Sequence, residues 1–287
     1  MTAIWKHELK QYFHSMTAYV FGAFLLAFVG IGAMYYNINA AISNFEYVLG
    51  FSGIIFVVIV PVLTMRVIAE ERKQKTDQLL YSLPVSTAKI ILGKYLALLV
   101  LYLVPLAVIA VYPQLFSIFG EVYLLTSYGS LLAFFLMGAA LIAIGVFISS
   151  LTENQGLAAG IGIAAMLLNY YSVTLAEYAT ATAFGSLLAL FVAAAVLGWL
   201  IWHLTKNSTV GYAVSLVLMA GLTVAYLLNS DAFEGLIPGV MEKLSLFDRL
   251  TTFVNGVFDV TAIVYYLSVI GFFLFLSVQS MEKRRYN

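Results

Sequence analysis

The chain has 287 residues, of which 63% are hydrophobic and 10% charged, and its formal net charge at pH 7 is zero. Charged residues make up about a quarter of an ordinary soluble domain, so this composition excludes a soluble globular protein. The zero net charge gives no reason to expect nucleic-acid binding, and the absence of cysteine excludes disulfides, thiolate metal sites and thiol catalysis.

Long apolar runs predict membrane-spanning helices. A helix needs about 20 apolar residues to cross the roughly 30 Å hydrocarbon core of a bilayer. Eight runs of suitable length have no charged residue in their middle, and they predict an all-α, polytopic helical bundle with eight spans. The sixth and seventh runs form a hairpin over 182–229 that could cross fully or re-enter, and either outcome keeps the number of spans even. The runs are Thr17–Asn37, Phe51–Ile68, Lys89–Phe116, Thr126–Leu151, Gln155–Thr174, Thr182–His203, Val210–Asn229 and Val260–Ser280.

The distribution of Lys and Arg predicts that both termini are cytoplasmic. Loops on the cytoplasmic side of a membrane retain these residues. With the N-terminus inside, only Lys243 and Arg249 fall outside, against twelve cations inside. The twelve are Lys6, Lys10, Arg66, Arg72, Lys73, Lys75, Lys89, Lys94, Lys206, Lys283, Arg284 and Arg285.

The sequence carries no motif for catalysis or for nucleotide binding. Gly93-Lys94 lacks the preceding glycine and the following Ser or Thr of a phosphate-binding loop. The histidines His7, His14 and His203 do not form a zinc motif, and we expect no catalytic, cofactor-binding or metal-binding residue. The spans also lack the midplane charges that proton- and sodium-coupled carriers use. Any chemical energy must therefore come from a partner.

The N-terminal segment 1–16 has the pattern of a helix that lies along a membrane surface. Trp5 and Leu9 share an apolar side, whereas Lys6, Glu8 and Lys10 lie on a polar side. The segment could be a simple anchor, or it could be an elbow that a cytoplasmic partner pushes.

The segment 69–88, between the second and third runs, is the most informative loop. Arg66 and Glu70 are four residues apart, so on one helix they would form a pair near the cytoplasmic boundary. A short leucine-bearing helix over Asp77–Leu83 follows, and Ser86 or Thr87 is placed to cap the third span. Taken alone, the leucines could pack within the loop or could be covered by a partner.

Two stretches of sequence resemble a known family. The segment from Pro61 to Tyr95 resembles the cytoplasmic loop of ATP-binding-cassette type-2 export permeases, and Phe253–Ser268 resembles their gliding-motility-associated branch. The first stretch carries the pattern at Thr64, Met65, Arg66, Glu70, Glu71, Thr76, Leu79, Leu80, Leu83, Pro84, Gly93 and Lys94.

The resemblance implies a permease subunit of the bacterial plasma (inner) membrane that is driven by a separate ABC ATPase subunit, which binds ATP and Mg. The functional unit would contain two ATPases and two permeases, the second permease being an identical copy or a paralogue. The elbow and the coupling helix Asp77–Leu83 would dock on the ATPase, and the outer loop 230–258 could contact a large extracytoplasmic subunit. The hairpin at 182–229 departs from the six spans usual in the family. The implied interface residues are Trp5, Glu8, Glu70, Glu71, Asp77, Leu79, Leu80 and Leu83.

Small residues mark one face of the fifth run. Gly156, Ala159 and Gly160, followed by Ala164, lie three and four positions apart, which lets helix backbones approach closely. The face could pack inside the chain or form a seam between two permeases. Asn255-Gly256 suits a turn, and Asp259 suits the cap of the last span.

Two other functions compete with that of an ABC permease. A membrane scaffold or mechanotransmitter would move an extracytoplasmic partner without carrying a substrate. A self-sufficient channel or secondary carrier is disfavoured because the spans lack midplane charges.

Overall fold

The computed structural model describes residues 2–76, 85–179, 181–205 and 208–285. Within these ranges the chain forms helices and turns without a strand, which confirms the prediction of an all-α fold. The helices form two compact units. Unit 1 comprises Met1–Tyr170 and Leu246–Asn287, and unit 2 comprises Tyr171–Ser245.

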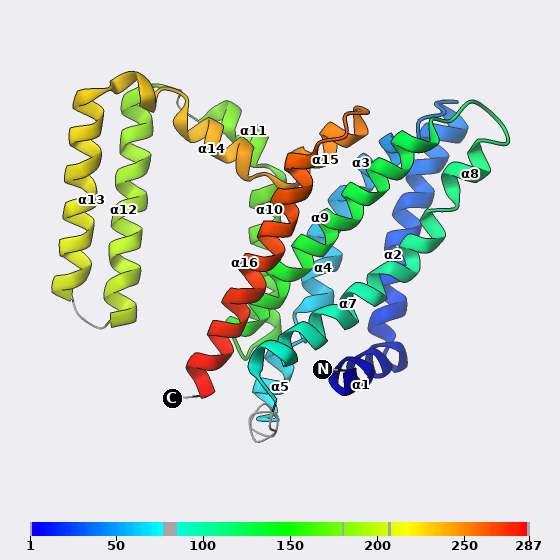
Figure 1. Ribbon diagram of the computed structural model, residues 1–287, viewed down its shortest axis with the longest axis horizontal. Helices are drawn as coiled ribbons and strands as arrows, with labels where there is room; N and C mark the ends of the chain where they lie inside the picture. Colours follow the sequence, from blue (N-terminus) through cyan, green and yellow to red (C-terminus); the bar gives the residue numbers. More distant parts are fainter. Residues whose placement is uncertain (1, 77–84, 180, 206–207, 286–287) are drawn as a thin grey trace. The chain divides into compact units, whose positions relative to one another are not determined.

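Unit 1 is a bundle of long helices with shorter helices at both ends (Figure 1). One end carries α1, α5, the start of α7 and the last turns of α16, and we name it the α1 end. The other carries η1, α3, α8 and α15, and we name it the α15 end. The elements of unit 1 are α1 (Thr2–His14), α2 (Met16–Ala33), the π-helix η1 (Met34–Asn39), α3 (Glu46–Ser52), the 3-10 helix η2 (Gly53–Ile55), α4 (Phe56–Thr64), α5 (Ala69–Lys73), α7 (Thr87–Ile109), α8 (Tyr112–Phe116), α9 (Leu124–Leu151), α10 (Gln155–Tyr170), α15 (Leu246–Val254) and α16 (Val260–Arg285).

Helix α9 is the centre of unit 1. In its most apolar stretch 78% of the residues are buried, against 22% for α16 at the edge of the bundle. Glycines let the neighbouring helices approach α9 closely. A Cβ atom at Gly138 would lie 2.7 Å from the ring of Tyr102 on α7, and the Tyr102 hydroxyl donates to the Phe134 carbonyl at 2.9 Å. These contacts hold α7 closely against α9.

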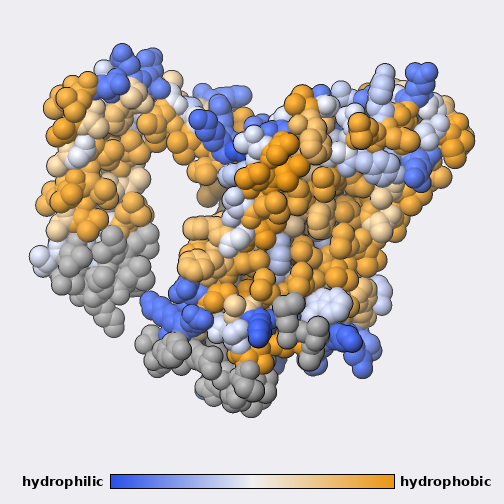
Figure 2. All heavy atoms as spheres, viewed as in Figure 1, coloured by the Kyte–Doolittle hydropathy of each residue, from blue (hydrophilic) through white to orange (hydrophobic). Residues whose placement is uncertain are grey.

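The surface of unit 1 has the polarity expected of a membrane protein. Figure 2 shows hydrophobic residues along the sides of the bundle, with hydrophilic residues gathered at its two ends. An apolar side wall is the surface that hydrocarbon solvates well, and the polar ends match the two headgroup regions.

Unit 2 consists of a helical hairpin and two short helices. Its elements are α11 (Ser172–Tyr178), α12 (Ala183–Thr205), α13 (Ser208–Leu228), the 3-10 helix η3 (Ser230–Phe233) and α14 (Leu236–Leu244). Helices α12 and α13 cross where glycine faces glycine, because a Cβ at Gly198 would lie 2.7 Å from the Gly211 carbonyl oxygen. Only 6% of the most apolar stretch of α13 is buried, so the hairpin presents apolar side chains to its surroundings.

The helices lie where the spans are predicted, but the structure does not establish that there are eight spans. Among the described residues, six helical segments are long and apolar enough to cross a membrane, and α10 with α11 would make a seventh if the pair is one broken span. A shorter apolar helix, Ala183–Trp199, belongs to the hairpin. The eighth span and the full crossing of the hairpin therefore stay predictions. The helix over residues 2–14 forms where the elbow is predicted, whereas its position along a membrane surface stays a prediction.

The second span begins earlier than predicted. The predicted span starts at Phe51, whereas the helical segment extends over Glu46–Lys73. Glu46 is buried in the first turn of α3, where its Oε1 accepts a hydrogen bond from the Ser127 hydroxyl at 2.9 Å. A carboxylate that is hydrogen-bonded at a helix N-terminus is compatible with the start of a span.

Two predicted helix N-caps and one predicted turn are confirmed. Ser86 is the N-cap of α7, although its hydroxyl makes no capping hydrogen bond. The Asp259 carboxylate accepts the backbone N–H of Thr261 at 2.8 Å and caps α16. Gly256 has a φ of +82°, the left-handed conformation that the predicted turn requires and that glycine adopts readily.

Candidate functional site

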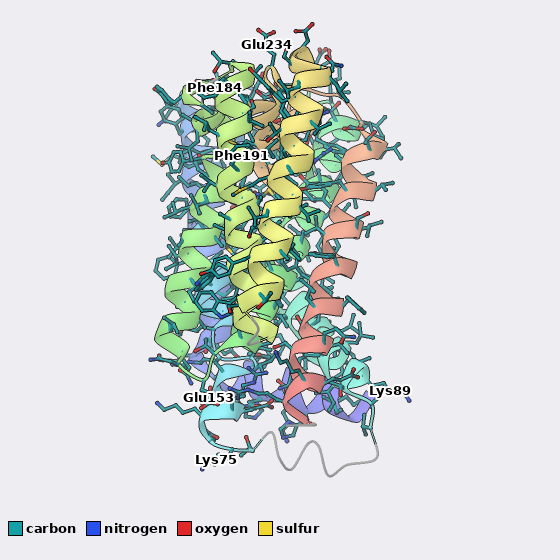
Figure 3. The ribbon with its side chains drawn as sticks, turned by 90° about the vertical axis from the view of Figure 1, so that its left-hand side faces the viewer. Lys75, Lys89, Glu153, Phe184, Phe191 and Glu234 are labelled. Atoms are coloured by element: carbon teal, nitrogen blue, oxygen red, sulfur yellow. The ribbon has the colours of Figure 1, made fainter. Side chains whose placement is uncertain are left out.

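The α1 end concentrates the charged side chains of unit 1. Figure 3 labels Lys75, Lys89 and Glu153, which all lie at this end. The residues of 77–84 join α5 to α7 here and lie outside the described residues, so the predicted interface residues Asp77, Leu79, Leu80 and Leu83 have no structural description. The described residues around that segment form the candidate site.

A buried ion-pair cluster joins three helices at this end. Lys94 on α7 donates to Glu8 Oε1 on α1 at 2.7 Å and to Glu71 Oε1 on α5 at 2.6 Å. The Lys94 side chain is only 1% exposed, and we name these three residues the Lys94 triad. Breaking a buried pair by removing one partner typically costs about 3–5 kcal/mol, because an uncompensated buried charge remains. The triad therefore resists separation of α1, α5 and α7.

The glycine before Lys94 explains how α1 reaches the cluster. A Cβ atom at Gly93 would lie 3.2 Å from Ile4 Cγ2 and 3.6 Å from the backbone nitrogen of Trp5, so a larger residue would crowd Ile4 unless the Ile4 side chain were also made smaller. The Trp5 Nε1 atom is buried and makes no hydrogen bond within the described part of the chain. Gly93 and Lys94 together thus hold the N-terminal helix against the start of α7.

Helix α5 is attached to α9 on its other side. Helix α4 ends at Thr64, and the Ser149 hydroxyl on α9 accepts the N–H groups of Ile68 and Ala69 at 3.1 Å each. The same hydroxyl donates to the Met65 carbonyl at 3.2 Å. One serine therefore satisfies the backbone groups that the break between α4 and α5 leaves without helical partners.

A second polar contact extends this attachment to α16. Buried Arg72 on α5 donates to the Ser150 carbonyl on α9, and the Ser280 hydroxyl on α16 donates to the same carbonyl at 2.9 Å. Nearby, Arg284 pairs with Glu153 at 2.6 Å, but both side chains are largely exposed. Exposed pairs contribute about 0–1 kcal/mol, so the buried contacts dominate the stability of this end.

The pair predicted between Arg66 and Glu70 does not form. Arg66 lies in the turn between α4 and α5, although the Glu70 N–H still donates to the Arg66 carbonyl at 3.3 Å. Within the described residues no carboxylate lies at ion-pair distance from Arg66, and the Glu70 carboxylate accepts a hydrogen bond from Gln74 at 3.3 Å. This prediction was wrong because the i to i+4 spacing does not show which partner a side chain selects.

A polar pocket of about 690 Å³ opens between α1 and the α4–α5 turn. Its walls include Arg66, Glu70, His7 and Tyr12, together with the Lys94 triad. Burial raises the pKa of Tyr12 well above its ordinary value, and the nearby carboxylates of Glu8, Glu71 and Glu70 raise it further, so the phenol stays protonated. The pocket holds no arrangement for bond chemistry, and its groups are suited to hydrogen bonding and charge pairing.

The residues predicted for the interface are thus partly brought together. Glu8 and Glu71 meet at Lys94, and Trp5 lies beside Gly93, one residue away. Glu70 lines the neighbouring pocket. Sequence reasoning gave Lys94 no role beyond the motif and the charge count. The signal that could have found it is a lysine about two turns inside an apolar helix, which requires a buried partner.

Two glycines of the small-residue face of α10 have no close helix neighbour among the described residues. In that part of the chain no atom lies within 4 Å of a Cβ built on Gly160, and a Cβ on Gly156 meets only the Asn154 side-chain oxygen, at 3.4 Å. The close approach of α10 to α4 occurs instead at Gly162, where a Cβ would lie 3.0 Å from Pro61 Cβ. Internal packing is therefore wrong for Gly156 and Gly160, and the seam that they form with Ala159 between two permeases stays a prediction.

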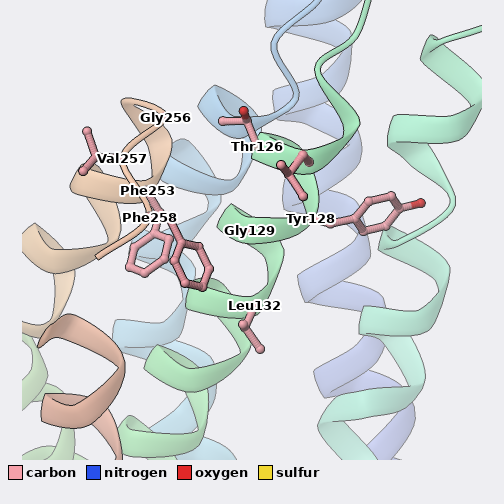
Figure 4. Close-up of a pocket in the computed structure, with 9 residues that line it drawn as sticks. Thr126, Tyr128, Gly129, Leu132, Phe253, Gly256, Val257 and Phe258 are labelled. Atoms are coloured by element: carbon pink, nitrogen blue, oxygen red, sulfur yellow. The ribbon is translucent and has the colours of Figure 1, made fainter. Parts of the chain in front are cut away.

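The α15 end contains an apolar groove of about 490 Å³ (Figure 4). Figure 4 shows Phe253 and Phe258 next to each other, with Leu132 of α9 nearby. The two rings meet edge to face with centroids 5.5 Å apart. Arg249, predicted to lie outside, sits over the Tyr265 ring at 4.0 Å from its centroid. The groove offers an apolar surface without a reactive group.

The described residues do not form a recognisable metal-binding site. No group of three or more His, Asp or Glu side chains among them is placed to hold a metal ion.

Comparison with protein families identifies a match. A family model described as ABC-2 family transporter protein matches residues 32–230, which is more than half of the chain. The matched region contains Glu71 and Lys94, the hairpin α12–α13 and the small-residue face of α10. No curated protein matches the chain.

Proposed function

The chain belongs to the ABC-2 family of transporter proteins, and we propose that it is a permease subunit driven by a separate ATP-binding subunit. It is a multi-pass membrane protein. The sequence has no phosphate-binding loop of its own, so ATP and Mg would be bound by the partner. Hydrolysis there would be converted into movement of the spans.

The observation that carries this proposal is the Lys94 triad together with its surroundings. The triad joins α1, α5 and α7, and α5 and α7 flank the predicted coupling helix Asp77–Leu83. A partner that pushed on this helix or on α1 would therefore act on the ends of three helices at once. Movement would reach α9 through Ser149 and Arg72.

The charge distribution supports a cytoplasmic position for the α1 end. The described cations of α1, α5, the start of α7 and the last turns of α16 all belong to this end, and the described cation of unit 1 at the α15 end is Arg249. Because Lys and Arg are retained on the cytoplasmic side, this distribution supports the proposal that both termini lie inside. An ATPase in the cytoplasm would face this end.

The function could be export of a substrate or transmission of force to another protein. The centre of unit 1 is filled by fully buried side chains of α9 such as Phe134, Met137 and Leu141, and the pockets described above for unit 1 lie at its two ends. Export would therefore require a path between two permease copies or a rearrangement of the helices. A mechanotransmitter would require neither.

Partners beyond the ATPase are also part of the proposal. The exposed face of Gly156, Ala159 and Gly160 is a candidate seam with a second permease, because small residues let two helix backbones approach closely. The gliding-motility-associated branch suggests a large extracytoplasmic subunit, and the outward-facing residues of α15, such as Asp248 and Thr251, would be available to it.

Copurification tests the proposed function directly. The tagged chain, extracted from its native membrane and purified gently, should bring down an ABC ATPase in equal copy number, with two permeases in each complex. Ion flux through the purified chain alone, without an ATPase, would contradict the proposal and favour a self-sufficient channel or carrier. In reconstituted vesicles, ATP hydrolysis with cargo movement would identify an exporter, whereas hydrolysis without cargo movement would identify a mechanotransmitter.

A further inference from the structure

The carboxylates of Glu8 and Glu71 point into the protein rather than toward a partner. Both lie at ion-pair distance from the same amine, on a lysine side chain that is 1% exposed. Glu8 belongs to the N-terminal helix, and Glu71 belongs to the short helix that leads into the predicted coupling segment. The two segments expected to receive force from an ATPase are therefore joined to each other through Lys94.

We propose that Lys94 is a positioning residue that holds α1, α5 and the start of α7 as one composite docking element. This inference rests on the proposed function, because it assumes that an ATPase contacts α1 and the segment 77–84. The triad fixes the positions of α1, α5 and the start of α7 relative to one another, so that a partner engages the three helices together. Glu8 and Glu71 act through Lys94, inside the permease, and the partner contacts are made by other side chains of the same segments.

The geometry distinguishes the triad from the other polar contacts at this end. Arg284 and Glu153 also form a short ion pair, at 2.6 Å, but their side chains are 42% and 56% exposed. Water can replace an exposed pair at little cost, whereas buried charges that are pulled apart have no such replacement. The Lys94 triad therefore keeps its three helices together during a movement, and the exposed pair does not.

The first test removes the triad without leaving a buried charge alone. The variant Glu8→Gln, Glu71→Gln, Lys94→Met replaces all three charged side chains with neutral ones. All three are changed together because Lys94→Met alone would leave two carboxylates without a counter-charge and could prevent folding. Hydrogen exchange is measured on the full chain in lipid nanodiscs. We expect the amides of residues 2–14 to exchange at least tenfold faster than in the unaltered chain, with α9 unchanged. The double variant Glu153→Gln, Arg284→Gln is the matched control, and it should leave α1 exchange unaltered.

The second test restores the attachment by a covalent bond. The chain has no cysteine, so two introduced cysteines can form an intramolecular disulfide only with each other. A Cβ at position 93 would lie 3.5 Å from Ile4 Cβ, within the range that a disulfide spans. In the triple variant, Ile4→Cys with Gly93→Cys should restore slow exchange of α1 when oxidised, and reduction should remove it. Disulfide formation is confirmed by the loss of free thiols.

The outcomes separate this inference from the proposed function. Unchanged α1 exchange in the triple variant, or fast exchange that persists after the disulfide has formed, would overturn the role of Lys94 while leaving the ATPase partnership intact. If the unaltered chain copurifies with no ATPase, the proposed function fails, whatever the rate of hydrogen exchange in α1. In the complex, a non-hydrolysable ATP analogue should change exchange in α1 and α7 together. In the triple variant that joint change should be lost and should return with the disulfide.

Discussion

Single glycines on α9 decide how closely the helices of unit 1 pack. A Cβ atom at Gly145 would lie 2.8 Å from Thr64 Cβ on α4, a separation that real Cβ atoms do not show. Thr64 cannot move away easily, because it is buried and its hydroxyl donates to the Val60 carbonyl at 2.9 Å. The crossing of α4 and α9 therefore depends on the absence of one methyl group.

Gly145→Ala should destabilise the protein. Overpacking a well-packed interior costs about 1–3 kcal/mol, so we expect the apparent Tm of the purified protein to fall by several degrees. Gly160→Ala is the matched control, because its Cβ would meet no atom within 4 Å and alanine is the better helix former. Its Tm should stay the same or rise slightly. Equal Tm values for the two variants would contradict the tight crossing.

At the scale of elements, the short helix α5 is held by neighbours that are distant in the sequence. Ser149 is about 80 residues away from the two N–H groups that it accepts. Glu71 and Arg72 are adjacent, yet one reaches α7 and the other reaches α9. Adjacent helical residues are about 100° apart around the axis, which lets five residues attach to two sides of the bundle.

Ser149→Ala should loosen the turn between α4 and α5. The buried N–H groups of Ile68 and Ala69 would lose their acceptor, and an unsatisfied buried donor costs about 1–3 kcal/mol. Hydrogen exchange of these two amides should become at least several-fold faster. Ser268→Ala serves as the control, since that exposed hydroxyl bonds only to its own helix at Val264. Unchanged exchange at Ile68 and Ala69 would contradict the role of Ser149.

The predicted coupling helix gives a second test at this scale. Leu80→Ala with Leu83→Ala removes two leucines from the segment implied to dock on the ATPase, and it should uncouple ATP hydrolysis from transport while the permease stays folded. Leu227→Ala with Leu228→Ala is the matched control, because these leucines are 78% and 82% exposed on α13. ATPase activity and copurification are measured for both. Unchanged coupling and unchanged ATPase association in the first variant would refute the assignment.

At the scale of the whole molecule, the chain divides into a packed bundle and a hairpin. The two ends of the hairpin segment lie next to each other, because the Gly235 N–H donates to the Ala181 carbonyl at 2.8 Å. Its helices contact each other closely through Gly198 and Gly211. A segment with this arrangement can be an insertion into a core that folds without it.

Removal of the hairpin tests this division. Deleting residues 182–234 and joining Ala181 to Gly235 by a short Gly-Ser linker should leave the slow exchange of α1 and α9 in unit 1 unchanged. In the full chain, Gly211→Leu should speed exchange in α12 and α13 only, because the added side chain would separate these two helices. Loss of protection in α9 after the deletion would show that unit 1 depends on the hairpin.

The candidate site was predictable only in part. The sequence identified Glu8 and Glu71 as interface residues, because the family resemblance implies that the elbow and the coupling loop dock on an ATPase. It did not reveal that the two carboxylates share Lys94, which is 86 residues from one and 23 from the other. The Arg66–Glu70 pair failed for a related reason, since the spacing of the two residues does not show that the Glu70 carboxylate bonds to Gln74 instead.

The amino-acid sequence by itself determined that this is an all-helical membrane protein, where its apolar helices lie, and which ends of them carry the cations. Hydropathy and charge are local properties, so a run of about 20 residues expresses them without reference to the rest of the chain. Only the tertiary structure decided which charges meet and which small residues are covered. Those contacts join residues far apart in the sequence, and they exist because α9 brings the other helices of unit 1 together.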